Sequence, residues 1–245
     1  MSSNIILIGI AISIMAIINN SIGFNPLKFT CDNYILNTYL YIVLSILLLF
    51  LTILKLSDNN VKFLDIFGGS KSILITILSF VLIIALMMIP PHMFFLKHIV
   101  WVLWLVLMGT LFYPLYLKNK YLFYQVGLIT ISIVGILSAI SFKFPHIITN
   151  SWWLPLFVSL IVILISTIIE TLLRSYGYIE SNKYNKILSY IIVILFSFWV
   201  MYDTKKIIVN STKCGKTLAP DYISESINLI LDMMNIFTNI HNIKE

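Results

Sequence analysis

The sequence has little charge. Only 11% of its 245 residues are charged, whereas 60% are apolar. A soluble domain carries about 25% charged residues and roughly 45–50% apolar ones. Too little polar surface would remain to cover a large soluble core. Apolar runs of about twenty residues recur along the whole chain instead, which is typical of a polytopic membrane protein.

Arginine is almost missing. Arg174 is the only one, and the formal net charge of +6 comes from lysines in the predicted loops. A nucleic-acid-binding protein gathers arginine and aromatic side chains on a soluble face, so no nucleic-acid partner is expected. In a membrane protein, a lysine excess reports orientation and contact with anionic lipid headgroups. The lipid bilayer is therefore the first expected partner.

Catalytic and metal-binding motifs are missing too. The sequence contains no HExxH, GxSxG or P-loop pattern, so no enzyme and no tightly bound cofactor are expected. Cys31 and Cys214 are the only cysteines, and neither has the CxxC or histidine-paired spacing of a metal site. They are either two unrelated thiols or a bridge between two loops. A bridge requires that both loops face an oxidising lumen.

Eight apolar segments predict an all-α polytopic membrane protein, a single domain over residues 1–245 that forms a bundle of seven to eight transmembrane helices. The first segment is short and has no Lys or Arg before it, so it makes a poor signal peptide and is interpreted as a span or half-span. The second to seventh segments are apolar all round, as lipid-exposed helices are. The predicted segments are 4–18, 35–56, 73–91, 96–117, 121–141, 153–173, 187–209 and 221–241.

The lysines of the loops leave the orientation open. The first loops on the side of the N-terminus carry more Lys and Arg than those on the other side, which favours a cytoplasmic N-terminus. The loop before the last segment contradicts this pattern, because its lysines would then lie on the far side. Those lysines are Lys205, Lys206, Lys213 and Lys216.

The first five segments contain no acidic residue, whereas the last three hold Glu170, Asp203, Glu225 and Asp232. A carboxylate at the bilayer centre costs about 2.5–3.5 kcal/mol on insertion scales, so such residues usually face the bundle interior or a watery cavity. Glu170 has two interpretations. It is either a third acid in an ion path or the partner of Arg174, four residues further along the helix.

The last segment carries a polar stripe among Ile, Leu, Met and Phe. Its members are separated by steps of three and four residues, which place them on one helix face. The stripe either joins helices through hydrogen bonds or lines a path for an ion or proton. A helix lying on the membrane surface is a third alternative, but the stripe lacks the Lys and Arg that such helices use. Its members are Glu225, Asn228, Asp232, Asn235 and Asn239.

The short loop 210–220 makes the segments on either side of it antiparallel neighbours. Counted from this loop, Asp203 and Asp232 differ in depth by roughly 8–10 Å for straight, level helices, and a stagger would bring them into contact. Two carboxylates in a low dielectric cannot both ionise cheaply, so a touching pair shares a proton and acts as a pH sensor. When deprotonated, the pair repels itself and attracts a cation such as Ca²⁺, which prefers oxygen ligands.

Two stretches of the sequence are similar to a known family. They are YDTKKII at 202–208 and PDYISESINLILDMMNIF at 220–237. Together they resemble the C-terminal signature of the transmembrane Bax-inhibitor-motif family. The 29-residue spacing from Asp203 to Asp232 resembles the Lifeguard and Golgi anti-apoptotic branch more than the Bax inhibitor proper. Residues 125–141 weakly resemble the fourth helix of the family.

The resemblance implies a seven-helix bundle with the last helix central, a pH-sensitive Ca²⁺ leak from internal stores and dampening of cell death. It assigns the gating pair to Asp203 and Asp232, which would bind Ca²⁺ transiently. We therefore expect an endoplasmic reticulum or Golgi protein that acts with other membrane proteins of cell-death control. Two features depart from the family: the second helix of the family carries a Glu and a nearby Arg that are missing here, and one N-terminal segment is extra.

Two other functions remain as alternatives. The first is a non-conducting membrane protein that modulates cell death by binding partner helices. The second is an intramembrane aspartyl protease, because such enzymes pair a YD on one helix with an aspartate on the next. Their second motif is GxGD, whereas this chain has LILD at 229–232, without the glycines that let backbone and substrate approach.

Overall fold

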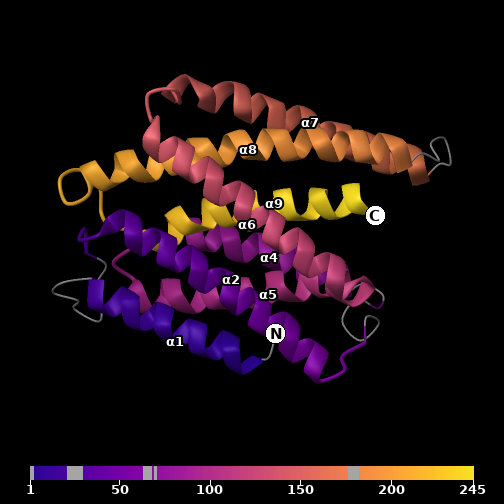
Figure 1. Ribbon diagram of the computed structural model, residues 1–245, viewed down its shortest axis with the longest axis horizontal. Coiled ribbons are helices and arrows are strands. Elements are labelled where there is room, and N and C mark those ends of the chain that lie inside the picture. The colour runs from indigo at the N-terminus through magenta and orange to yellow at the C-terminus, as the bar shows by residue number, and fades with distance from the viewer. Residues whose placement is uncertain (1–2, 21–29, 63–67, 69–70, 176–181) are drawn as a thin grey trace. The chain divides into compact units, whose positions relative to one another are not determined.

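The computed structural model is built of α-helices (Figure 1). The structure describes residues 3–20, 30–62, 68, 71–175 and 182–245. Within these ranges there is no β-sheet, which confirms the predicted all-α class. The helices are α1 (Ser3–Asn20), α2 (Tyr34–Asp58), α4 (Lys71–Met88), α5 (Phe94–Lys118), α6 (Lys120–Lys143), the short 3-10 helix η1 (Asn150–Trp152), α7 (Trp153–Ser175), α8 (Asn182–Lys213) and α9 (Tyr222–Lys244).

Five stretches of the described chain are long and apolar enough to cross a membrane. They comprise α2, α5, α6, most of α8, and η1 together with most of α7. Helices α1 and α4 contain shorter apolar stretches, Asn4–Ile18 and Ile73–Met88. Only 6% of the apolar window of α7 is buried, so its Ile, Leu and Val side chains need lipid around them. The protein is an integral, multi-pass membrane protein.

Helix α9 differs from these five. It lies where the sequence predicts the last segment, but it is not among the described helices apolar enough to cross a membrane. Most of its side chains are buried, including those of Glu225, Asp232 and Asn239. A polar helix with buried side chains is what the predicted bundle requires at its centre, because neighbouring helices shield its polar groups from lipid.

Helix α8 is longer than the sequence analysis predicts. Its 32 residues span about 48 Å at 1.5 Å per residue, against about 30 Å of hydrocarbon. The predicted segment 187–209 already contains Lys205 and Lys206, whereas Lys213 lies on the helix rather than in the predicted loop 210–220, which corrects the assignment of that residue. Hydropathy marks where a helix leaves lipid, and it does not mark where the helix ends.

The contacts divide the chain into two compact units. The first unit comprises Met1–Lys120 with Val209–Ile230, and the second comprises Tyr121–Ile208 with Leu231–Glu245. Helices α8 and α9 contribute residues to both units. The single domain predicted over residues 1–245 stays a prediction, and the two units are described separately below.

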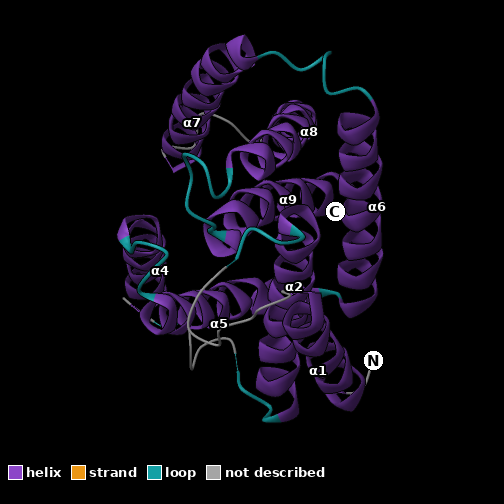
Figure 2. Ribbon diagram, turned by 90° about the vertical axis from the view of Figure 1, so that its left-hand side faces the viewer, coloured by secondary structure: helices purple, strands orange, loops and turns teal. Residues whose placement is uncertain are grey.

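In the first unit, α2 packs between α1 and α5, and α5 also packs against α4 (Figure 2). Gly109 lies where α2 and α5 meet. A Cβ at this position would lie 2.8 Å from Thr52 Cβ and 3.0 Å from the Leu49 carbonyl oxygen. Only glycine allows this approach, as in other membrane helix pairs. The Tyr113 hydroxyl donates to the carbonyl of Val61, 2.8 Å away, just beyond the end of α2.

In the second unit, α6 contacts both α8 and α9. The rings of Phe123 and Phe237 lie 4.9 Å apart, edge to face, which joins α6 to the end of α9. The hydroxyls of Ser138 and Thr204 lie 3.1 Å apart in a buried position, which joins α6 to α8. Both contacts belong to the second unit, which also holds Asp203 and Asp232.

Candidate ion path along the last helix

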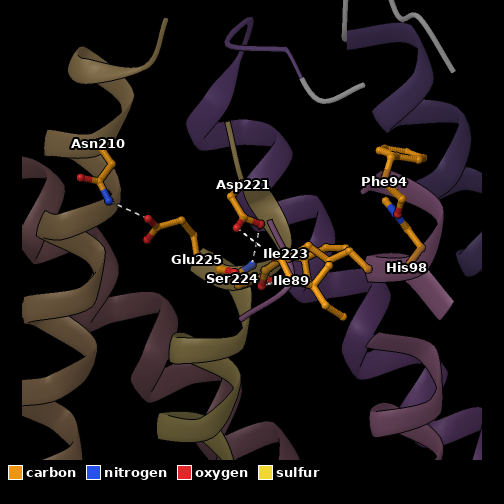
Figure 3. Close-up of polar contacts among 10 residues, drawn as sticks. Ile89, Phe94, His98, Asn210, Asp221, Ile223, Ser224 and Glu225 are labelled. Carbon is orange, nitrogen blue, oxygen red and sulfur yellow. Dashed lines mark hydrogen bonds and ion pairs between the residues drawn. The ribbon is translucent and has the colours of Figure 1, made fainter. Parts of the chain in front are cut away.

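The polar stripe of α9 is present as one face of a continuous helix, and none of its members is fully exposed. Its hydrogen bonds differ along its length. Asn235 and Asn239 donate their side-chain amides to carbonyls of α9 itself, at 2.9 and 2.8 Å. Glu225 instead accepts a hydrogen bond from Asn210 of α8, at 2.6 Å (Figure 3). Of these three side-chain bonds, the one between helices therefore lies at the start of α9.

Asp203 and Asp232 both belong to the second unit, and both are buried, with 8% and 5% of their surface exposed. Asp203 lies near enough for its charge to act on the Asp232 carboxylate. The Oδ2 atom of Asp232 is buried and has no hydrogen-bond partner among the described residues. A buried carboxylate oxygen without a donor is costly, so this position favours a bound proton or a cation. The predicted difference in depth between the two residues stays a prediction.

The start of α9 carries a second charged cluster, which sequence reasoning missed. The carboxylate of Asp221 uses both of its oxygens. Oδ1 accepts the backbone N–H of Ser224 at 3.1 Å, as an N-cap does, and Oδ2 lies 2.5 Å from the Lys97 Nζ atom. Lys97 also donates to the Ile89 carbonyl at 2.9 Å, and its side chain is only 1% exposed. The sequence did contain an indication of this pair, because Lys97 is a charged residue inside a predicted apolar segment.

The two cysteines form a disulfide, with Cα atoms 5.6 Å apart. Of the two alternatives left open by the sequence, the bridge is therefore correct and the unrelated thiols are wrong. Beside it, the Tyr222 hydroxyl donates to the carbonyl of Thr30 and accepts from the Asn37 amide at 3.3 Å. These bonds join the start of α9 to the start of α2.

The remaining predicted site residues have less definite surroundings. Glu170 is buried in α7, within the second unit. The side chain of Arg174 lies outside the described residues, so the predicted Glu170–Arg174 pair is not described. In the described part of the chain, no group of three or more His, Cys, Asp or Glu side chains is arranged to hold a metal ion.

The sequence model of one protein family, described as inhibitor of apoptosis-promoting Bax1, matches residues 31–244. The chain belongs to this family. The match contains both aspartates and every helix from α2 to α9, whereas α1 precedes it. This confirms the resemblance stated from the two C-terminal stretches. No curated protein matches the chain. Membership of this Bax-inhibitor family supports, in general terms, a role at a membrane in restraining cell death or regulating Ca²⁺.

Proposed function

We propose that this Bax-inhibitor-family protein is a pH-sensitive Ca²⁺ leak channel, or a regulator of stored Ca²⁺, in the membrane of the endoplasmic reticulum or Golgi. Asp203 and Asp232 form its gate. The observation that carries the proposal is the Asp232 carboxylate, buried without a donor among the described residues and close to a second buried acid. The proposal includes no enzymatic activity and no resident cofactor.

The gate works through one shared proton. When the pair holds a proton, the two carboxylates attract each other and hold α8 and α9 together in the second unit. Loss of that proton leaves two negative charges in a low dielectric, which repel each other and attract a divalent cation. Because the pair supplies few of the six to eight oxygens that Ca²⁺ takes, the ion is bound transiently and moves on.

The other stripe residues serve the same path. The amide N–H groups of Asn235 and Asn239 are used by the backbone of α9, so their amide oxygens are the atoms offered to a passing cation. Asn228 and Glu225 continue the stripe toward the start of the helix. Glu170 is proposed as a third acid of the path.

Flux into liposomes tests the gate. The purified full-length protein is reconstituted with a Ca²⁺ indicator inside, and the influx is recorded at a series of pH values. We expect influx that changes between about pH 6 and 8 and is altered in Asp203→Asn and Asp232→Asn. Asp58→Asn makes the same chemical change at an exposed helix end and should behave as the wild type.

Other outcomes favour the alternatives. No flux at any pH would refute the channel. Cleavage of a membrane peptide that is lost in both aspartate variants would favour an intramembrane aspartyl protease.

A non-conducting interaction protein is the second candidate, and an observation in the second unit favours it. An open apolar groove with a volume of about 460 Å³ runs between α7 and α8. Val162 lies in its wall and is 57% exposed. A partner helix that binds here would lose contact in Val162→Trp. Ile165, also on α7 and 51% exposed, is not in that wall and provides the control. Loss of protection from cell death in Val162→Trp alone, with protection kept in both aspartate variants, would favour this function.

A further inference from the structure

Three connections meet at the start of α9, all within the first unit. We call this cluster the clasp. It consists of the Cys31–Cys214 disulfide, the Lys97–Asp221 ion pair and the hydrogen bonds of the Tyr222 hydroxyl. The clasp joins the first turn of α9 to the starts of α2 and α5 and to the end of α8.

The turn after α8 is shaped to present Cys214. The N–H of Gly215 donates to the Leu218 carbonyl at 3.0 Å, and the N–H of Leu218 donates to the Lys213 carbonyl at 3.2 Å. Gly215 has a φ of +76°, a value that favours glycine. A Cβ on Gly215 would lie 3.5 Å from the Cys31 Sγ atom. The turn therefore holds Cys214 against Cys31.

The clasp lies on one side of the membrane, because its residues are all at or near the ends of helices. Cys31 and Cys214 are 183 residues apart in the sequence, yet both lie at helix ends, before α2 and after α8. Lys97 lies in the first turn of α5, and Asp221 directly precedes α9. A disulfide persists only in an oxidising compartment, so this side is the lumen of the store or the cell exterior. The lysine pattern of the first loops, which favours a cytoplasmic N-terminus, agrees with this orientation.

Two of the lysines that enter the orientation count are bonded inside the fold. Lys97 is neutralised by Asp221, and Lys205 of the second unit donates to the Ile148 carbonyl. A lysine that is bonded inside the fold reports less about orientation than a free one. The lysines before α9 therefore contradict a cytoplasmic N-terminus less strongly than their number alone suggests.

We propose that the clasp is a redox-controlled restraint on α9, facing the oxidising side of the membrane and released when the Cys31–Cys214 disulfide is reduced. The reductant is a dithiol. One of its thiolates attacks a cysteine sulfur, and its second thiolate resolves the mixed disulfide. The dithiol leaves as a disulfide, and both cysteines become thiols. Cys214 is buried, with 9% of its surface exposed, but Cys31 is half-buried and residues 215–217 are exposed, so a small reductant can reach the bond at Cys31.

Release is local, because the other two connections do not depend on sulfur. The ion pair and the Tyr222 bonds persist after reduction, so α9 stays folded and its first turn gains freedom. Asp232 lies on the same helix. That freedom changes the Ca²⁺ leak only if the proposed function holds, whereas the clasp and its orientation do not rest on that function.

The first experiment measures thiols in the full-length protein inserted into sealed microsomes. An impermeant maleimide–polyethylene glycol is added to either side, with or without the impermeant phosphine TCEP, which takes an oxygen from water and yields two thiols. We expect no labelling without TCEP and two additions after TCEP from the lumenal side alone. Cys31→Ser and Cys214→Ser should each take one label without TCEP. Labelling of the unreduced wild type, or labelling from the cytoplasmic side, would overturn the proposal.

The second experiment compares oxidised and reduced protein in micelles and in liposomes. Reduction should lower the thermal midpoint of the wild type by at least about 4 °C and change its Ca²⁺ leak at least about twofold. The double Cys31→Ser, Cys214→Ser variant should show neither effect. An unchanged thermal midpoint would refute the claim that the disulfide restrains the fold. A lowered midpoint with an unchanged Ca²⁺ leak would refute the claim that this restraint controls α9. Absence of any leak in either redox state counts against the proposed channel, while the midpoint and the labelling still decide the clasp.

Discussion

The ion pair at the start of α9 predicts that its two partners are not equivalent. Asp221→Asn removes the charge but keeps the cap, because Asn and Asp are equally good N-caps. It leaves the Lys97 ammonium, which is 1% exposed, with its hydrogen bond to the Ile89 carbonyl but without the carboxylate charge. A buried charge that loses its partner costs about 3–5 kcal/mol. We expect a loss of that size for Asp221→Asn.

Lys97→Met should cost less. Methionine replaces the apolar stem of the lysine, and the carboxylate left behind is 19% exposed, so water can reach it. Asp221 also keeps its hydrogen bond to the Ser224 N–H. We expect a loss of about 1–3 kcal/mol, the range for a polar group that loses one partner. The double variant has neither charge, so its loss should not exceed that of Asp221→Asn, because replacing a whole buried pair is often nearly neutral.

Intrinsic fluorescence of the five tryptophans follows thermal unfolding of these variants in micelles. A change of 1 kcal/mol shifts the midpoint by about 2–4 °C for chains of this size. The expected decrease is therefore about 6–20 °C for Asp221→Asn and about 2–12 °C for Lys97→Met. A larger loss in Lys97→Met than in Asp221→Asn, or a double variant whose loss equals the sum of the two single losses, would refute the reasoning about burial.

The remaining predictions use the same measurement. Gly109→Ala should lose about 1–3 kcal/mol, because its new methyl group would meet a backbone carbonyl of α2. Gly135→Ala, with nothing within 4 Å of the new methyl, should be neutral or up to about 1 kcal/mol more stable; equal effects at the two glycines would contradict the packing of α2 on α5. Tyr113→Phe should cost about 1 kcal/mol, since it removes the donor at the end of α2, and no change would mean that water replaces this bond. Ser138→Ala should cost about 0.6–1.7 kcal/mol because it removes the bond to Thr204, and a gain in stability would count against that bond.

The positions of the membrane helices were predictable because solvation is a local property of the chain. The predicted segment 35–56 contains almost all of α2, which runs from Tyr34 to Asp58. The end of α8 was not predictable in the same way. Residues 210–213 follow the predicted segment 187–209 and are polar on a hydropathy scale, yet they continue the helix to Lys213, and lysine has good helix propensity.

The candidate site was predictable in part. The spacing of three and four residues placed Asp232 on a polar stripe, and the family signature selected Asp203 as its partner. The burial of both aspartates, and the lack of a donor to Asp232 Oδ2 within the described part of the chain, come from the structure. Lys97 was missed because a single lysine near a helix start resembles a loop lysine in sequence, and its partner Asp221 is 124 residues away.

The sequence by itself determined the membrane class, the helical segments and the family, because each follows from residues that are near one another in the chain. The tertiary structure alone decided between a disulfide and two thiols, paired Lys97 with Asp221 and buried Asp203 and Asp232 in the same unit. These three features join groups that are far apart in the chain, and their energies depend on distance and on exclusion of water. Composition and spacing specify neither the distance between such groups nor the exclusion of water from them, so these features could be known only from the packed helices.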